Sequence, residues 1–413
     1  MAAAALVLVL QGREGNLHST MYDGRLVSAD YWTDRPQILS AGFGFDGIIA
    51  VDGDDDASTH AVGGAYDTTV QCAQAPTDAD RSSVALARGL DPLLLESPGT
   101  SIHNVDGTPV VFSWPIRTDT LDPSQFRFTL NTGEVVGVDA ITMTPNFELN
   151  ERNTVVMFSD LGNRGQASDP NARYPIRLDI VDATDGRSLM LAGPSGDISA
   201  TGLSWTTSKT PYDVGPTLAG AKLNRVDAPP QGEGGVSGLG GTTLPNDEGA
   251  LYGDGPTFRL RMLTTGGFSP DGVRGIRPDD FGTFFRLHAT GPDGHDVVLS
   301  DVGQQHVVNG GTLTIVGLAD TGQKADAAAG VAYDDCYAED RDNYIDIMLA
   351  GDEAAARSIT DLEIPGREGG YTSLYNPGGP GRTPYPDRKY TAPGSPSLTP
   401  VTMALDNPMR VSR

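Results

Sequence analysis

Hydrophobic and polar residues alternate in short runs along most of the chain. In one run, Phe126, Phe128 and Leu130 alternate with Arg127 and Thr129. In an extended strand, such alternation places the apolar side chains on one face and the polar side chains on the other. Asp-Gly, Asn-Gly and Gly-Gly pairs interrupt the runs about every ten residues, as turns between strands do. The pattern predicts a mainly β fold built from sandwiches or barrels.

Helical periodicity is almost absent. Short helices are expected only over residues 83–90 and 352–359, the second with Asp352 as its N-cap. The fold class expected is therefore mainly β, with short helices and long Gly- and Pro-rich loops.

One block of the sequence carries a recognisable arrangement of strand ends and turns. A Phe-Ser-x-Pro-aliphatic strand end is followed by a Thr-Leu turn and a Phe-containing strand. These positions are Phe112, Ser113, Pro115 and Ile116, followed by Thr120, Leu121 and Phe126. The block resembles the immunoglobulin-like domains of bacterial surface-layer proteins and adhesins over about residues 108–200. The resemblance implies a β-sandwich that serves as a spacer or binding module without catalytic residues.

A second region, about residues 251–325, shows weaker sequence similarity to this block. Pro278 and Phe281 take the places of Pro123 and Phe126. Internal similarity of this kind predicts a second, diverged sandwich. The alternative is that any two β sequences with Asp/Pro turns look alike.

The length of 413 residues exceeds what one ordinary core accommodates, and it predicts two or three domains. Gly- and Pro-rich stretches mark the approximate boundaries between these domains. The expected segments are 1–15 (a signal remnant or a first strand), 16–107 (an N-terminal β region), 108–226 (the immunoglobulin-like sandwich), 227–250 (a linker or mobile loop), 251–330 (the second sandwich) and 331–413 (a C-terminal segment packing back on the body). The tail after residue 365 could be ordered through its tyrosines or disordered.

The composition is strongly acidic, with a formal charge of −25 and a pI near 4.4. A nucleic acid or an anionic membrane would repel such a surface, which argues against both as partners. The apolar run over residues 1–10 is shorter than the about 20 residues of a membrane span, so no span is expected. The composition favours a secreted or cell-surface protein.

The two cysteines, Cys72 and Cys336, lie far apart in the sequence. They could form one long-range disulfide, which requires an oxidising compartment, or they could be two unrelated buried thiols. The second case is compatible with a cytosolic protein.

A first acidic cluster follows an apolar run, with Asp52, Asp54 and Asp56 at alternate positions. The spacing matches the first ligands of an EF-hand loop, but Ala57 and Gly63 stand where that loop needs Gly and Glu. A looser Ca²⁺ site and a solvated acidic turn are the two interpretations.

A second acidic cluster contains Asp340, Asp342 and Asp346. In a strand, Ile345 and its apolar neighbours would face a core, while Asp342, Tyr344 and Asp346 would face outward. With Asp340 just before the strand, the three carboxylates of Asp340, Asp342 and Asp346 would suit a hard cation such as Ca²⁺. An exposed, charged edge that discourages aggregation is the alternative.

No catalytic signature accompanies these clusters. The histidines lack zinc spacing, and nucleophile elbows, phosphate loops and dinucleotide fingerprints are missing from the sequence. The leading interpretation is a secreted or surface-exposed binding or scaffold module whose ligand is a carbohydrate or a protein, with Ca²⁺ as a stabilising ion if the acidic clusters bind it. The alternative is a secreted enzyme on a β scaffold that acts on a polysaccharide or a small-molecule ester through acidic residues.

Overall fold

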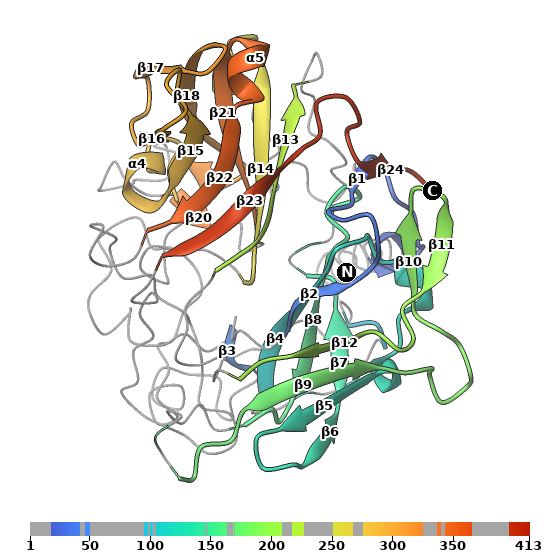
Figure 1. Cartoon of the computed structure of the whole chain (residues 1–413). Coiled ribbons are helices and arrows are strands. Elements are labelled where there is room, and N and C mark those ends of the chain that lie inside the picture. Colours follow the sequence, from blue (N-terminus) through green and yellow to red (C-terminus); the bar gives the residue numbers. More distant parts are fainter. Residues whose placement is uncertain are drawn as a thin grey trace, which may run out of the picture.

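The computed structural model describes most of the chain as a mainly β protein, which confirms that part of the predicted fold class. Two β units lie one above the other in Figure 1. The described residues are 18–41, 46–49, 95–97, 100, 102, 105–144, 146, 148–162, 168, 170–208, 217–226, 251–266, 276–324, 337–339, 343–365 and 396–413.

The lower unit, here called the two-sheet unit, contains two sheets that share one core. The first sheet has the order β2 (Ile38–Ala41), β4 (Val105–Phe112), β8 (Thr154–Ser159) and β7 (Ala140–Thr142), with β3 (Asp46–Ile49) also paired to β4. The second sheet has the order β12 (Ser204–Thr206), β9 (Pro175–Ile180), β5 (Phe126–Leu130) and β6 (Val135–Gly137).

Local sequence explains how β5 begins and which way it faces. The 3₁₀ helices η1 (Thr118–Thr120) and η2 (Pro123–Gln125) precede it. The Asp122 side chain accepts from the Ser124 amide at 2.9 Å, and the Gln125 side chain accepts from the Asp122 amide at 3.0 Å. This capping box starts η2, which leads directly into the alternating strand, whose apolar side chains enter the core as predicted.

The upper unit, here called the barrel-like unit, is a single nine-stranded sheet that curls into a nearly closed barrel. Its order is β16 (Asp296–Leu299), β15 (Arg286–Thr290), β22 (Ile359–Ile364), β23 (Ser397–Met403), β13 (Leu218–Arg225), β14 (Phe258–Thr264), β21 (Tyr344–Gly351), β18 (Gly311–Ala319) and β17 (Gln305–Val308). Strands β13 and β23 are parallel, and the other neighbours are antiparallel. Alternate residues of each strand, such as Leu223, Leu260 and Ile347, fill the interior.

The barrel-like unit does not follow the predicted boundaries at 251 and 330. Its sheet also takes β13 from before residue 227 and β21, β22 and β23 from the C-terminal segment. The strand pairing also differs from that of residues 108–206, which divide among three sheets, one of them the β10–β11 pair. The pairing therefore does not reproduce a second copy of the first block, and the immunoglobulin-like character of that block stays a prediction.

Helices are few and short among the described residues, as expected. They include α4 (Phe281–Phe284) and α5 (Glu353–Ala356). The helix predicted over 352–359 is shorter than expected because Ile359 already begins strand β22. The Asp352 side chain does not cap the helix but accepts from the Thr312 amide at 2.9 Å. The helix predicted over 83–90 lies outside the described residues.

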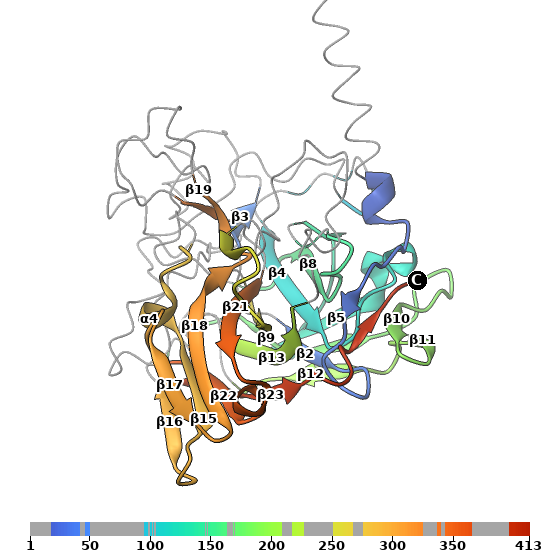
Figure 2. The same cartoon turned by 90° about the horizontal axis from the view of Figure 1, so that it is seen from above.

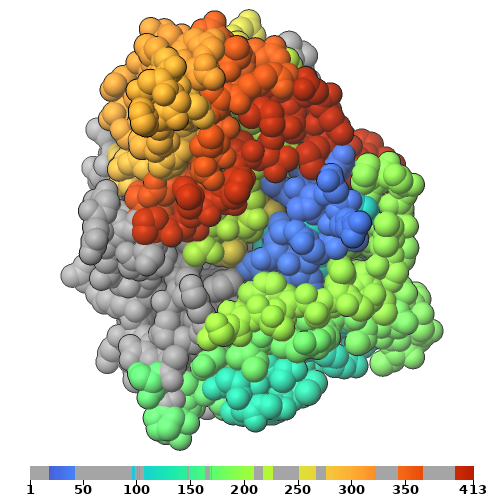
Figure 3. All heavy atoms as spheres, in the orientation of Figure 1, coloured from blue at the N-terminus to red at the C-terminus, as the bar shows by residue number. Residues whose placement is uncertain are grey.

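Two-stranded pairs complete the structure. They are β10 (Met190–Gly193) with β11 (Gly196–Ser199), β19 (Gly322–Lys324) with β20 (Tyr337–Glu339), and β1 (Ala29–Asp30) with β24 (Arg410–Val411). The β1–β24 pair joins the first and last described strands, and Val411 belongs to the core of the two-sheet unit. In Figure 3, the N-terminal segment (blue) lies between the barrel-like unit (orange and red) and the two-sheet unit (green and cyan).

Candidate functional site

The outward face of the barrel-like unit carries charged residues where the two-sheet unit covers it. Lys222 on β13, Arg261 on β14 and Asp346 on β21 lie side by side in register, and each has 0% of its surface exposed. Strand alternation sends their neighbours Leu260 and Ile347 into the barrel core, so these three side chains point to the other unit. The result is a buried polar interface between the two units.

Arg261 is the centre of this interface and is surrounded by four carboxylates. Its Nε and Nη2 donate to the two oxygens of Asp346 at 2.9 and 3.0 Å. Nη2 also donates to Asp320 at 2.9 Å, and Nη1 forms ion pairs with Glu151 at 3.1 Å and Asp30 at 3.4 Å. One guanidinium therefore binds carboxylates from both units, using the planar fork that distinguishes Arg from Lys.

Three further cations lie beside these carboxyl groups. Lys222 pairs with Asp30, Arg410 lies 3.4 Å from the same carboxylate, and Arg259 lies 3.4 Å from Asp346. The charged residues of this ion-pair network are Asp30, Glu151, Lys222, Arg259, Arg261, Asp320, Asp346 and Arg410. Buried charges persist only when paired in this way, because an isolated ion in a low dielectric is strongly disfavoured.

Two carboxyl groups of the interface have pKa values shifted in opposite directions: the pKa of Asp30 is lowered and that of Asp320 is raised. Burial raises the pKa of Asp30, but the charges of Lys222 and Arg261 outweigh it and hold that pKa below its usual range. Burial and the neighbouring charge of Glu151 raise the pKa of Asp320 well above its usual value, against the opposing effect of Arg261. Burial also lowers the pKa of the Lys222 ammonium, against the attraction of Asp30. Asp320 is thus a carboxyl that the fold favours in its protonated form.

Aromatic rings form the apolar part of the interface. Trp32 and Tyr344 lie 6.3 Å apart, measured between ring centroids. The Lys222 Nζ lies 5.2 Å from the Trp32 ring, and the Arg261 Cζ lies 5.4 Å from the Tyr344 ring. Cations at these distances from an aromatic face gain cation–π stabilisation, most when they are desolvated.

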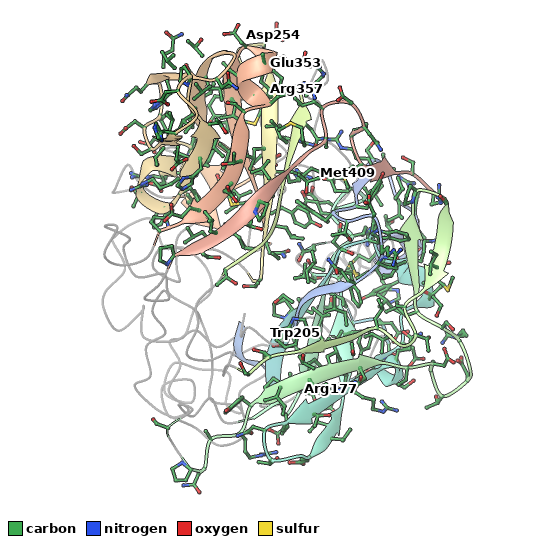
Figure 4. The ribbon with its side chains drawn as sticks, viewed as in Figure 1. Arg177, Trp205, Asp254, Glu353, Arg357 and Met409 are labelled. Carbon is green, nitrogen blue, oxygen red and sulfur yellow. The ribbon has the colours of Figure 1, made fainter. Side chains whose placement is uncertain are left out.

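The Lys222 ammonium is held by three acceptors. Besides pairing with Asp30, it donates to the backbone carbonyls of Met409 at 3.0 Å and Tyr31 at 3.3 Å. Met409, labelled in Figure 4, lies on the segment that leads from the barrel-like unit to strand β24. All three N–H donors of the ammonium are therefore satisfied by the N- and C-terminal segments.

A polar loop between β7 and β8 fills the rest of the interface. Its buried polar members are Asn146, Glu148, Asn150, Glu151, Arg152 and Asn153. The Asn146 side chain donates to Asn343 at 2.8 Å, and the Tyr344 hydroxyl donates to Asn153 at 2.9 Å. These side chains of the two-sheet unit thus hydrogen-bond directly to residues at the start of β21. Burial of a polar loop requires such partners.

The structure corrects the expectation for the second acidic cluster. Asp346 and Tyr344 share the face opposite Ile345 and Ile347, as predicted, but the expectation that this face meets solvent is wrong. The two-sheet unit covers it, and Arg261 and Arg259 pair with the Asp346 carboxylate in place of a cation from solution.

The remaining predicted metal ligands, Asp52, Asp54, Asp56, Asp340 and Asp342, lie outside the described residues, as do Cys72 and Cys336. Within the described ranges, no group of three or more His, Cys, Asp or Glu residues is arranged to hold a metal ion. The Ca²⁺ sites therefore stay predictions.

Sequence reasoning missed the interface because its residues resemble a solvated face. A strand that alternates Arg with Leu, as in 258–264, is normally exposed on its polar side. One signal was present, namely the segment 146–154, in which charged and amide residues surround Leu149 without the Gly or Pro of an ordinary loop.

Two substitutions in this interface should have contrasting effects. Asp346→Asn removes one partner of a buried bidentate pair and is expected to lower the free energy of unfolding by about 3–5 kcal/mol. Asp320→Asn mimics the protonated carboxyl and should change it by less than about 1 kcal/mol, because Asn also tolerates the positive φ of 58° at this position.

The raised pKa of Asp320 determines how the free energy of unfolding changes with pH. Because its pKa is raised on folding, its contribution to stability is complete at low pH and is lost as the pH rises through the folded-state value. Urea denaturation between about pH 5 and pH 9 should therefore shift in favour of the Asp320→Asn variant as the pH rises. Equal losses from the two substitutions at every pH would contradict this assignment.

Comparisons with known proteins identify no relative: no protein-family model matches the chain, and neither a curated protein nor a solved structure is significantly similar to it. No helix within the described ranges is long and apolar enough to cross a membrane.

Proposed function

We propose that the protein is a non-catalytic binding or scaffold protein of the cell exterior, with two β units held in one fixed orientation. The observation that supports this most directly is the set of four carboxylates around Arg261, contributed by both units. Buried ion pairs often add little net stability, and in some proteins they specify one geometry, which would suit a spacer or a platform for ligands. The resemblance of residues 108–200 to immunoglobulin-like domains and the acidic composition agree with this role.

The alternative function, a hydrolase with paired acids, is less well supported by the described residues. The interface gathers the perturbed carboxyl and amine groups Asp30, Lys222 and Asp320, which is a feature of active sites. However, Arg261 and Lys222 occupy these carboxylates, and both cations are themselves fully buried. Groups that satisfy one another in this way are better suited to holding a structure than to binding a substrate.

The two functions can be separated by assaying the full chain for turnover and for binding. A scaffold or binding protein should release no product from nitrophenyl esters or from soluble polysaccharides, and it should bind immobilised polysaccharide or protein reversibly. Small-angle scattering at about 0.1 M and about 1 M NaCl should give the same radius of gyration, because buried pairs are little screened by salt. Ester or glycoside hydrolysis above the buffer rate would overturn the proposal.

We further propose that Ca²⁺ stabilises the protein through Asp52, Asp54, Asp56, Asp340 and Asp342. Clustered carboxylates repel one another unless a cation screens them. A chelator should then lower the melting temperature, and added Ca²⁺ should restore it. An unchanged melting curve together with no bound metal by elemental analysis would remove calcium from the proposal.

A further inference from the structure

His288 on β15 lies between two carboxylates on neighbouring strands of the barrel-like unit. Its Nδ1 is 3.0 Å from an oxygen of Asp296 on β16, and its Nε2 is 2.7 Å from an oxygen of Glu363 on β22. The imidazole and Glu363 are largely buried, whereas Asp296 is exposed. The three residues, here called the His288 bridge, span three adjacent strands.

The hydrogen bonds fit a protonated ring. A neutral imidazole has only one N–H donor, whereas two ionised carboxylates can only accept. An imidazolium donates to both of them. Partial burial lowers the pKa of His288, but the hydrogen bonds to Asp296 and Glu363 outweigh this effect and raise the pKa above the ordinary 6.5.

The His288 bridge lies beside the seam of the barrel, the junction where β16 and β17 approach each other. These strands stand at opposite ends of the sheet order, and β16 pairs with β15 alone among the described strands. The seam is crossed near the start of β16, where the Asn309 amide after β17 donates to the Thr290 carbonyl of β15 at 2.8 Å. Figure 2 shows β15, β16 and β17 together at this edge of the unit.

Other charged residues lie near His288 on the same face of the sheet, and they affect how loss of its proton changes strand pairing. Asp361 on β22 pairs in register with His288. Arg286 on β15 donates to the backbone carbonyls of Gly282 and Phe285, both at 2.6 Å. Strand β23 adds no titratable group here, because Leu398 and Pro400 are its residues opposite Glu363 and Asp361.

Without the proton on His288, three carboxylates would therefore share this face with one guanidinium that already binds carbonyls. Like charges on neighbouring strands destabilise their pairing.

We propose that the His288 bridge is a proton-dependent connection that holds the edge strand β16 to the barrel and weakens when the imidazolium loses its proton. The raised pKa sets the direction of this response. The stabilisation is complete below about 6.5 and is lost as the pH rises through the folded-state pKa of His288. The inference does not depend on the proposed function.

Hydrogen exchange on the full chain tests the proposal. The protection factors of the β16 amides should fall with rising pH, by about tenfold for each unit by which the measured pKa of His288 exceeds 6.5. The pKa itself is measured by NMR of labelled histidine, with the His288 signal assigned by its loss in His288→Gln. Amides of the central strand β14 provide the internal reference.

Two variants make the outcome decisive. His288→Gln should abolish the pH dependence at β16, whereas His295→Gln, on the adjacent exposed turn, should leave it unchanged. If His288→Gln does not fold, Glu363→Gln serves instead and should bring the pKa of His288 down towards 6.5. A folded-state pKa at or below 6.5, or β16 protection that is independent of pH in the unmodified protein, would overturn the proposal.

Discussion

Replacing Arg261 by methionine is expected to lower the free energy of unfolding by about 3–5 kcal/mol, or to prevent folding altogether. The substitution leaves the carboxylates of Asp30, Glu151 and Asp346 buried without the guanidinium that they share with Asp320. Methionine fills a similar volume, so the loss reports the charge rather than a cavity. Urea denaturation followed by circular dichroism measures it.

Three companion variants distinguish this effect from a general intolerance of change. Arg261→Lys keeps the charge but loses the planar fork, and it should fall between the wild type and Arg261→Met. Arg261→Met combined with Asp346→Asn removes one stranded carboxylate and should recover part of the loss. Arg177→Met, on the exposed face of β9 labelled in Figure 4, should leave the midpoint unchanged. The interface would lose its assigned role if Arg261→Met had as little effect as Arg177→Met.

Replacing Trp32 by alanine is the second change with a large expected effect. Trp32 packs against Tyr344, Leu263 and Val111, and its ring lies beside the Lys222 ammonium. Truncation of a buried Trp costs about 3–5 kcal/mol, since it leaves a cavity and removes packing. Because this packing joins the two units, we expect one unfolding transition in the wild-type protein and two in Trp32→Ala.

The distribution of tryptophan provides the measurement. The chain has three tryptophans, and the other two, Trp114 and Trp205, pack with the core of the two-sheet unit. Fluorescence therefore reports that unit, whereas circular dichroism reports both. The two signals should coincide in the wild type and diverge in Trp32→Ala. Leu398→Ala, at a side chain with 58% of its surface exposed, is the control and should preserve coincidence. Coincident transitions in Trp32→Ala would mean that the units are joined by other contacts.

Strands with local signals were predictable from the sequence. Strand β5 follows a capping box and alternates strictly. Such signals depend on residues within a few positions of one another, which explains why the position and the core-facing side chains of β5 agree with the expectation.

The covering of a strand face depends on distant residues and was not predictable. Period-two alternation assigns Tyr344 and Asp346 to one face, but it cannot distinguish water from another β unit as the neighbour of that face. The parallel pairing of β13 with β23 joins segments on either side of two long Gly- and Pro-rich stretches. For the same reason, the boundary drawn at 251 separated β13 from the sheet to which it belongs.

The contacts of Asp30 also have a consequence for the order of events on the ribosome. Its partners Lys222, Arg261 and Arg410 lie 192, 231 and 380 positions later in the chain. Until these segments have been synthesised, the nascent N-terminal region carries Asp30 and Glu151 without the cations that would permit their burial. Contacts of such long range are formed slowly and late. We therefore expect the native state to be reached only after translation of the C-terminal strands, with the partly made chain dependent on chaperones in the interval.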